Sequence, residues 1–272
     1  MPIPTIKFNN GNYIPELGLG LWKIKNEEEF KNTVNAALNS GYRHFDTAQA
    51  YDNEKLLGEV LKKSDIKRED LFITTKIWLK NFGFNHVAKS FDKSLENLQT
   101  DYADLLLLHF PVTGLRRKAW QALENIQAEG KALNIGVSNY MIHHLEDMKK
   151  YAKITPQINQ VEMHVFLQQP DLVRYCQDNG IVVEAYSPIA HGKEMDDPVI
   201  KKIAIKHNKT YAQIMIRWCI EKGFVVIPKS STPSRVIQNI DVFDFELDKD
   251  DLAEIKKIDK NLRTCWSPVH IP

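Results

Sequence analysis

The stretch "LLLLH", residues 105–109, decides the fold class. Four leucines in succession leave no polar position between them, so a strand formed here is covered on both faces, as in a parallel sheet. Apolar runs of similar length stand at residues 71–76, 132–138, 181–186 and 224–228. Amphipathic helical patterns separate these runs. We therefore expect a chain built from repeated strand–helix units.

Polar residues end the predicted strands at regular intervals. Asp46 and Lys76 are 30 residues apart, Lys76 and His109 are 33 apart, and His109 and Ser138 are 29 apart. This interval is the length of one strand followed by one helix and its loops. The spacing indicates that the same unit repeats along the chain.

Two further short strands, near Leu17 and at residues 157–162, bring the number of units to eight. No linker rich in proline, glycine or serine divides the chain. We predict the α/β class and a single (β/α)8 barrel over residues 1–272, rather than a doubly wound sheet. An N-terminal hairpin around Asn10 and Gly11 is expected to plug the bottom of the barrel. Helices beyond the ideal pattern are expected in the segments 197–207, 210–222 and 250–258.

Composition and charge limit the classes of partner. The 272 residues carry a formal net charge of +1 with both signs interspersed, so no basic stripe favours nucleic acid or a membrane surface. Cys176, Cys219 and Cys265 lack CxxC spacing and predict reduced thiols. We expect a cytoplasmic monomer that acts on a small molecule and needs no metal.

In such a barrel the chemistry gathers at the carboxyl ends of the strands. Lys76 can pair there with Asp46 on the neighbouring strand and present its remaining ammonium protons to the Tyr51 hydroxyl. The cation is expected to lower the pKa of Tyr51 from about 10, so that the phenol can donate a proton near neutral pH. His109 can then orient a substrate carbonyl. This combination suits the reduction of a carbonyl group.

Other interpretations of the same residues remain open at this point. Lys76 and Asp46 can form a purely structural ion pair. The chain can be a nucleotide-sensing binding protein, or a lyase that uses Lys76 as a Schiff base. The cluster at His143, His144 and Glu146 has no supporting metal-ligand spacing and is interpreted as a solvated helix face.

Seven motifs together resemble the aldo-keto reductases, in the same order and over nearly the whole chain. By this resemblance Tyr51 is the general acid, Lys76 and Asp46 tune it, and His109 positions the carbonyl. The resemblance implies reduction of aldehydes, α-dicarbonyls and activated ketones. The motifs are "GYRHFDTAQAYDNE", "ITTKIW", "LLLLHFPV", "GKALNIGVSNY", "INQVEMH", "VEAYSP" and "VIPKSSTPSRVIQNI".

The resemblance also implies an NADPH site without a Rossmann fold. Cations and hydroxyls at a strand-to-helix junction suit a phosphate dianion, which favours NADP over NAD. The matching positions are Ser138, Asn139 and Gln160 for the nicotinamide carboxamide, Tyr186 for ring stacking, Ser187 for the pyrophosphate, Lys229, Ser230, Thr232 and Arg235 for the 2′-phosphate, and Gln238 with Asn239 for adenine.

The substrate pocket is expected to be aromatic, lined by Trp22, Trp78 and Phe110. The chain departs from the family pattern at Phe110, where tryptophan is frequent, and at Asp52, where glycine is usual. These departures affect the prediction of which substrate is bound more than the prediction of which reaction is catalysed. The tail at residues 263–272 is short, which predicts a wide mouth and loose specificity.

Overall fold

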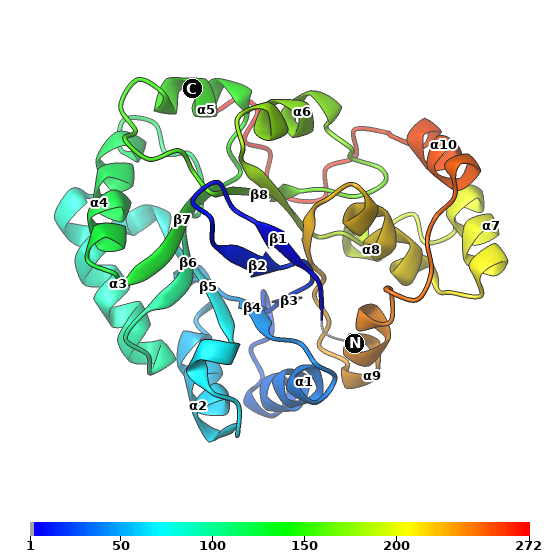
Figure 1. Ribbon diagram of the computed structural model, residues 1–272, viewed down its shortest axis with the longest axis horizontal. Coiled ribbons are helices and arrows are strands. Elements are labelled where there is room, and N and C mark those ends of the chain that lie inside the picture. Colours follow the sequence, from blue (N-terminus) through cyan, green and yellow to red (C-terminus); the bar gives the residue numbers. More distant parts are fainter. Residues whose placement is uncertain (1–2) are drawn as a thin grey trace.

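The computed structural model describes residues 3–272 and shows a barrel of eight parallel strands. The strands follow one another around the sheet in chain order, from β3 to β10. Parallel bridges from Leu17 to Val226 and from Gly20 to Lys229 join the first strand to the last. Figure 1 views the barrel end-on, with the helices arranged around it. The predicted (β/α)8 architecture is confirmed.

The strands are short and lie close to the predicted apolar runs. The barrel strands are β3 (Leu19–Gly20), β4 (His44–Asp46), β5 (Phe72–Ile77), β6 (Ala103–Leu108), β7 (Ala132–Ser138), β8 (Ile158–Glu162), β9 (Val182–Tyr186) and β10 (Val225–Ile227). The hairpin strands are β1 (Thr5–Lys7) and β2 (Tyr13–Pro15).

Helices cover the outside of the barrel. They are α1 (Glu27–Asn39), α2 (Glu54–Lys63), α3 (Phe84–Leu98), α4 (Arg116–Ala128), α5 (Ile142–Met148), α6 (Pro170–Asp178), α7 (Pro198–His207), α8 (Tyr211–Glu221), α9 (Pro233–Ile240) and α10 (Lys249–Lys257). The extra helices predicted from the sequence correspond to α7, α8 and α10.

The hairpin closes one end of the barrel, as predicted. Phe8 and Ile14 pack in one buried cluster with Leu105 and Leu107, which point into the barrel. The alternate residues of β6, Leu106 and Leu108, belong to the core between sheet and helices. Both faces of the "LLLL" run are therefore buried, which is why its apolarity is continuous.

Local signals in the sequence set the helix ends. Asn26 caps α1, because its side chain accepts a hydrogen bond of 2.9 Å from the backbone N–H of Glu29. Trp120 and Trp218 are buried in α4 and α8 and belong to the core between sheet and helices. Within residues 3–272, no helix combines the length and apolarity that crossing a membrane requires.

Candidate active site

Two adjacent strands place a buried ion pair at the mouth of the barrel. Asp46 ends β4 and Lys76 lies near the end of β5, and both side chains are buried. The Lys76 ammonium donates to Asp46 Oδ1 at 2.5 Å, to the carbonyl oxygen of Thr47 at 3.0 Å and to the Tyr51 hydroxyl oxygen at 3.3 Å. These acceptors use all three ammonium protons, so the Tyr51 proton itself remains available for another acceptor.

The loop that carries Tyr51 is held by Gln49, which sequence reasoning missed. Gln49 Oε1 accepts hydrogen bonds from the Trp78 backbone N–H at 2.8 Å and from Asn81 at 2.9 Å. Asp52, directly after Tyr51, has a φ of 57° in the left-handed region. That conformation explains why glycine suits the position, and aspartate tolerates it better than most residues.

The expectation that Lys76 lowers the pKa of Tyr51 is wrong for the free protein. Burial raises the pKa of Tyr51 well above its ordinary value, and the negative charge of Asp46 adds to the shift. The Lys76 charge is already matched by Asp46 at 2.5 Å. Tyr51 is therefore protonated at neutral pH, which is the state that a proton donor needs.

His109 follows β6 and faces the same cluster. Its ring lies edge-on to Tyr51 at 5.7 Å and to Trp78 at 5.2 Å between centroids. Burial, followed by the Lys76 charge, holds the pKa of His109 well below its usual range. The imidazole is thus neutral and can donate a single N–H to a carbonyl oxygen. The four predicted catalytic residues are brought together.

The residues predicted to hold the nicotinamide lie on, or directly after, the three consecutive strands β7, β8 and β9. Asn139 donates to Ser138 Oγ at 3.0 Å and accepts from the Tyr186 hydroxyl at 2.7 Å. Gln160 on β8 donates to Asp46 Oδ2 at 2.8 Å, so it also contacts the catalytic cluster. Ser187 follows with its hydroxyl 2.9 Å from His191 Nε2. One continuous rim therefore joins the predicted nicotinamide residues to the ion pair.

A cavity of about 420 Å³ opens at the start of α9 and contains all six residues predicted for the adenosine phosphate and adenine. Its lining holds two cations, Lys229 and Arg235, but no carboxylate. This donor set fits an anionic phosphate. Ser231 and Tyr211 also line the cavity and were missed from the sequence, although Ser231 stands within the quoted motif; Tyr211 lies outside it. The predicted residues there are Lys229, Ser230, Thr232, Arg235, Gln238 and Asn239.

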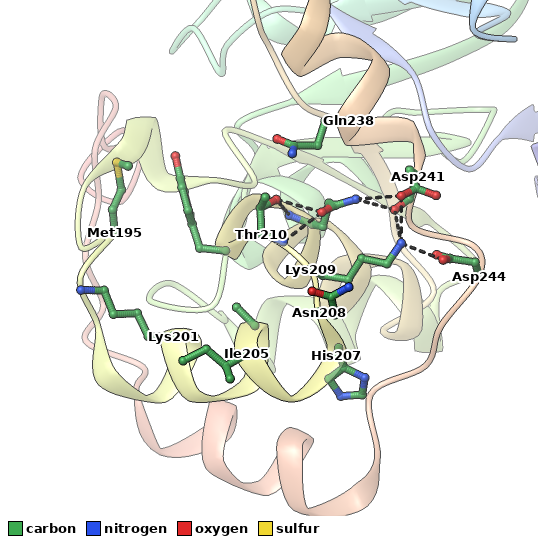
Figure 2. A pocket seen from close by; sticks show the side chains of 13 residues that line it. Met195, Lys201, Ile205, His207, Asn208, Lys209, Thr210, Gln238, Asp241 and Asp244 are labelled. Atoms are coloured by element: carbon green, nitrogen blue, oxygen red, sulfur yellow. Dashed lines mark hydrogen bonds and ion pairs between the residues drawn. The ribbon is translucent and has the colours of Figure 1, made fainter.

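Figure 2 shows a second, more open cavity of about 1020 Å³ bounded by α7, α8 and α9. It shares Met195, Thr210, Tyr211 and Gln238 with the phosphate cavity, but its lining contains none of the four predicted catalytic residues. Its Lys209 is paired with Asp241 at 2.9 Å and Asp244 at 2.7 Å. The charge of this lysine is already matched, and we assign the cavity no catalytic role.

The aromatic residues predicted for the substrate pocket differ in their surroundings. Trp78 lies against His109, as described above. Trp22 is 37% exposed and contacts His191 edge-on at 5.6 Å. Phe110 is half-buried directly after His109. The structure thus places Trp78 against His109, which is predicted to be catalytic, and Trp22 next to the loop after β9, while Phe110 follows His109 in the chain.

The interpretation of His143, His144 and Glu146 as a solvated helix face is wrong for His144, whereas His143 and Glu146 are exposed. Both imidazole Nε2 atoms donate to the carbonyl oxygen of Ile271 at 2.8 Å, and His144 is buried. Arg116 donates to the Pro272 carbonyl oxygen at 2.5 Å. The C-terminus therefore lies beside α5 (Figure 1).

The start of the same tail is held by Glu162, another residue that sequence reasoning missed. Its carboxylate accepts from the Thr264 backbone N–H at 2.6 Å and from the Cys265 N–H at 3.2 Å. Cys265 Sγ then lies 3.2 Å from His191 Nε2. The short tail is anchored at both ends. Cys176, Cys219 and Cys265 are free in the structure.

Comparisons with known proteins agree with this geometry. Residues 16–260 match the profile described as the Aldo/keto reductase family. The chain is 44% identical to the glyoxal reductase of Bacillus subtilis strain 168, over 97% of this chain and 96% of that protein. It is 45% identical to the methylglyoxal reductase DkgA of Escherichia coli strain K12, over 98% of each.

A solved structure of a Bombyx mori aldo-keto reductase in complex with NADP superposes with a TM-score of 0.91. It is 34% identical in sequence, and the match covers 97% of this chain and 95% of that one. The likeness therefore extends through the whole barrel.

Proposed function

This chain belongs to the aldo/keto reductase family, and we propose that Tyr51 is the proton donor with which it reduces carbonyl compounds. It is an oxidoreductase that acts on carbonyl groups with a nicotinamide cofactor. The observation that carries the proposal is the Lys76 ammonium, which binds both Asp46 and the Tyr51 hydroxyl oxygen. We propose that residues 1–272 act as one reductase unit.

The roles of the four residues follow from the hydrogen bonds of Lys76 with Asp46 and Tyr51 and from the position of the His109 ring beside Tyr51. A bound reduced nicotinamide supplies the hydride. Tyr51 gives its proton to the carbonyl oxygen, and the Lys76 ammonium stabilises the negative charge that develops on the phenol oxygen. Asp46 keeps Lys76 in place, and the neutral His109 donates to the same carbonyl oxygen. A hydride and a proton together convert the carbonyl into an alcohol.

We propose NADP(H) as the cofactor. The cavity at α9 has Lys229 and Arg235 among its lining residues and no carboxylate that would repel a 2′-phosphate. The Bombyx mori relative was solved with NADP. Ser138, Asn139, Gln160 and Tyr186 are proposed for the nicotinamide, and Ser187 for the pyrophosphate.

We propose small aldehydes, α-dicarbonyls and activated ketones as substrates, with Trp22, Trp78 and Phe110 in the pocket. Two relatives that are 44% and 45% identical are named glyoxal and methylglyoxal reductase, and both of those substrates are small α-dicarbonyls. That the protein acts as a monomer in the cytoplasm stays a prediction from charge and cysteine pattern.

The test follows NADPH absorbance at ~340 nm while the protein is mixed with glyoxal, methylglyoxal or an aromatic aldehyde. We expect turnover by the wild type, and a loss of at least about 100-fold in Tyr51→Phe with NADPH binding intact. Tyr13→Phe, on the exposed hairpin, is the control.

Two results would contradict the proposal. Binding of NADPH without oxidation by any carbonyl compound would favour a nucleotide-sensing protein. A borohydride-trapped substrate adduct on Lys76 would favour a Schiff-base lyase.

A further inference from the structure

Glu184 is a buried acid that the proposed reaction does not use. It lies in the middle of β9, opposite Gln160 of β8, and is fully buried. The side-chain amide nitrogen of Gln160, Nε2, donates both to Asp46 Oδ2 and to Glu184 Oε2, each at 2.8 Å. Both amide protons are therefore used by carboxyl groups. Gln160 Oε1 is left to accept a hydrogen bond, as a carboxamide N–H of the cofactor requires.

Glu184 has no cation of its own. Lys76 directs its three protons to Asp46, Thr47 and Tyr51. His44 Nε2 lies 3.7 Å from Glu184 Oε1, but burial lowers the pKa of His44 to about 3, so the ring is neutral. Among the described residues, Glu184 Oε1 has no hydrogen-bond partner. An anion in this position would be costly.

Strands on both sides pack around Glu184. β4 contributes His44 and Asp46, β5 contributes Lys76, and β8 contributes the uncharged Gln160. On the other side, β10 places Val225 opposite Glu184 in the sheet. Burial and, next, the Asp46 charge raise the pKa of Glu184 to about 8. At neutral pH the cluster thus holds a neutral Glu184 beside one ion pair.

Building on the proposed function, we propose that Glu184 is a positioning residue for carbonyl reduction. In its neutral form it fixes the Gln160 amide together with Asp46. Its ionisation in alkaline solution places a second anion beside the Asp46–Lys76 pair. That anion competes for the Lys76 ammonium and makes Tyr51 a weaker acid, because negative charge nearby stabilises the protonated phenol.

The first test compares the pH dependence of kcat in the wild type and Glu184→Gln, with NADPH and glyoxal. Glutamine keeps the shape and the acceptor for Gln160 but does not titrate. We expect wild-type kcat to fall about tenfold from pH 7 to pH 9, as an essential group with a pKa near 8 requires. The variant should keep wild-type kcat at pH 7 within about twofold and lose the alkaline fall.

The matched control is Glu124→Gln. Glu124 is also buried, but it accepts from the backbone N–H groups of Lys153 and Ile154 on the outside of the barrel, at 2.6 and 2.9 Å. We expect this variant to keep the wild-type pH profile. An unchanged alkaline fall in Glu184→Gln would overturn the inference, as would loss of most turnover at pH 7 in a folded Glu184→Gln protein.

A second measurement needs neither turnover nor a folded variant. Infrared difference spectra of the wild type between pH 7 and pH 9 should show the loss of a protonated carboxyl band. Absence of that loss would overturn the inference even if Glu184→Gln does not fold. A wild type without turnover at any pH would instead contradict the proposed function, and the infrared result would still decide the state of Glu184.

Discussion

The Lys76 ammonium donates to the Tyr51 hydroxyl oxygen over 3.3 Å and leaves the phenol proton free. This direction of donation makes Tyr51 an acid rather than a base. The cation lowers the cost of the phenolate that forms when the proton leaves, although burial keeps the resting pKa of Tyr51 high. In the proposed reaction, the lysine therefore acts during proton transfer more than before it.

The buried Asp46–Lys76 pair should show strong coupling between its two partners. Asp46→Asn leaves a buried cation without a counter-charge, and Lys76→Met leaves a buried anion, so each should lower the free energy of unfolding by about 3–5 kcal/mol. The double variant should lose less than the sum of the two. Urea denaturation of the three variants measures this, and additive losses would show that the charges do not interact.

Arg235 should discriminate between the two nicotinamide cofactors. Because it lines a cavity without carboxylates, Arg235→Ala should weaken NADPH binding about tenfold or more and change NADH binding less than about twofold. Fluorescence titration of both cofactors gives the two dissociation constants. Lys209→Ala, whose charge is paired with Asp241 and Asp244, is the control. Equal weakening of both cofactors would rule out recognition of the 2′-phosphate.

The anchored tail can be monitored through Cys265. Cys176 and Cys219 are buried, so a thiol reagent should modify Cys265 first. Glu162→Gln weakens the hold on Thr264 and removes an anion that raises the pKa of Cys265, after the effect of burial. Both changes should speed alkylation, by about tenfold. Mass spectrometry after timed alkylation measures the rate at each cysteine, and Glu124→Gln should leave it unchanged.

The sequence was most informative where burial leaves a local pattern. The apolar run at 105–109 and the even spacing of the strand ends predicted the barrel. They also predicted that Asp46, Lys76 and His109 lie at the same mouth of it. Glu184 was not predicted as a functional residue, although it stands within the apolar run at residues 181–186. An acid inside an apolar strand is costly without a partner and is therefore a signal in the sequence. The hydrogen bond from His144 to Ile271 left no signal in the sequence, because these residues are 127 positions apart and neither belongs to a repeating pattern.

Stability should depend on pH through Glu184. The pKa of this group is raised to about 8 in the folded protein from 4.5, so its contribution is fully present below pH 4.5 and is lost as the pH rises to about 8. Over that window the loss is about 1.4 kcal/mol per pH unit. Glu184→Gln does not titrate, so its free energy of unfolding should rise relative to the wild type from pH 5 to pH 8.

Urea denaturation of both proteins at pH 5, 6.5 and 8 measures this difference. Groups common to the two proteins cancel in the comparison, which isolates residue 184. A difference that stays constant with pH would mean that Glu184 is already ionised at pH 5 in the folded protein. In that case Lys76 would be shared between two carboxylates rather than held by Asp46.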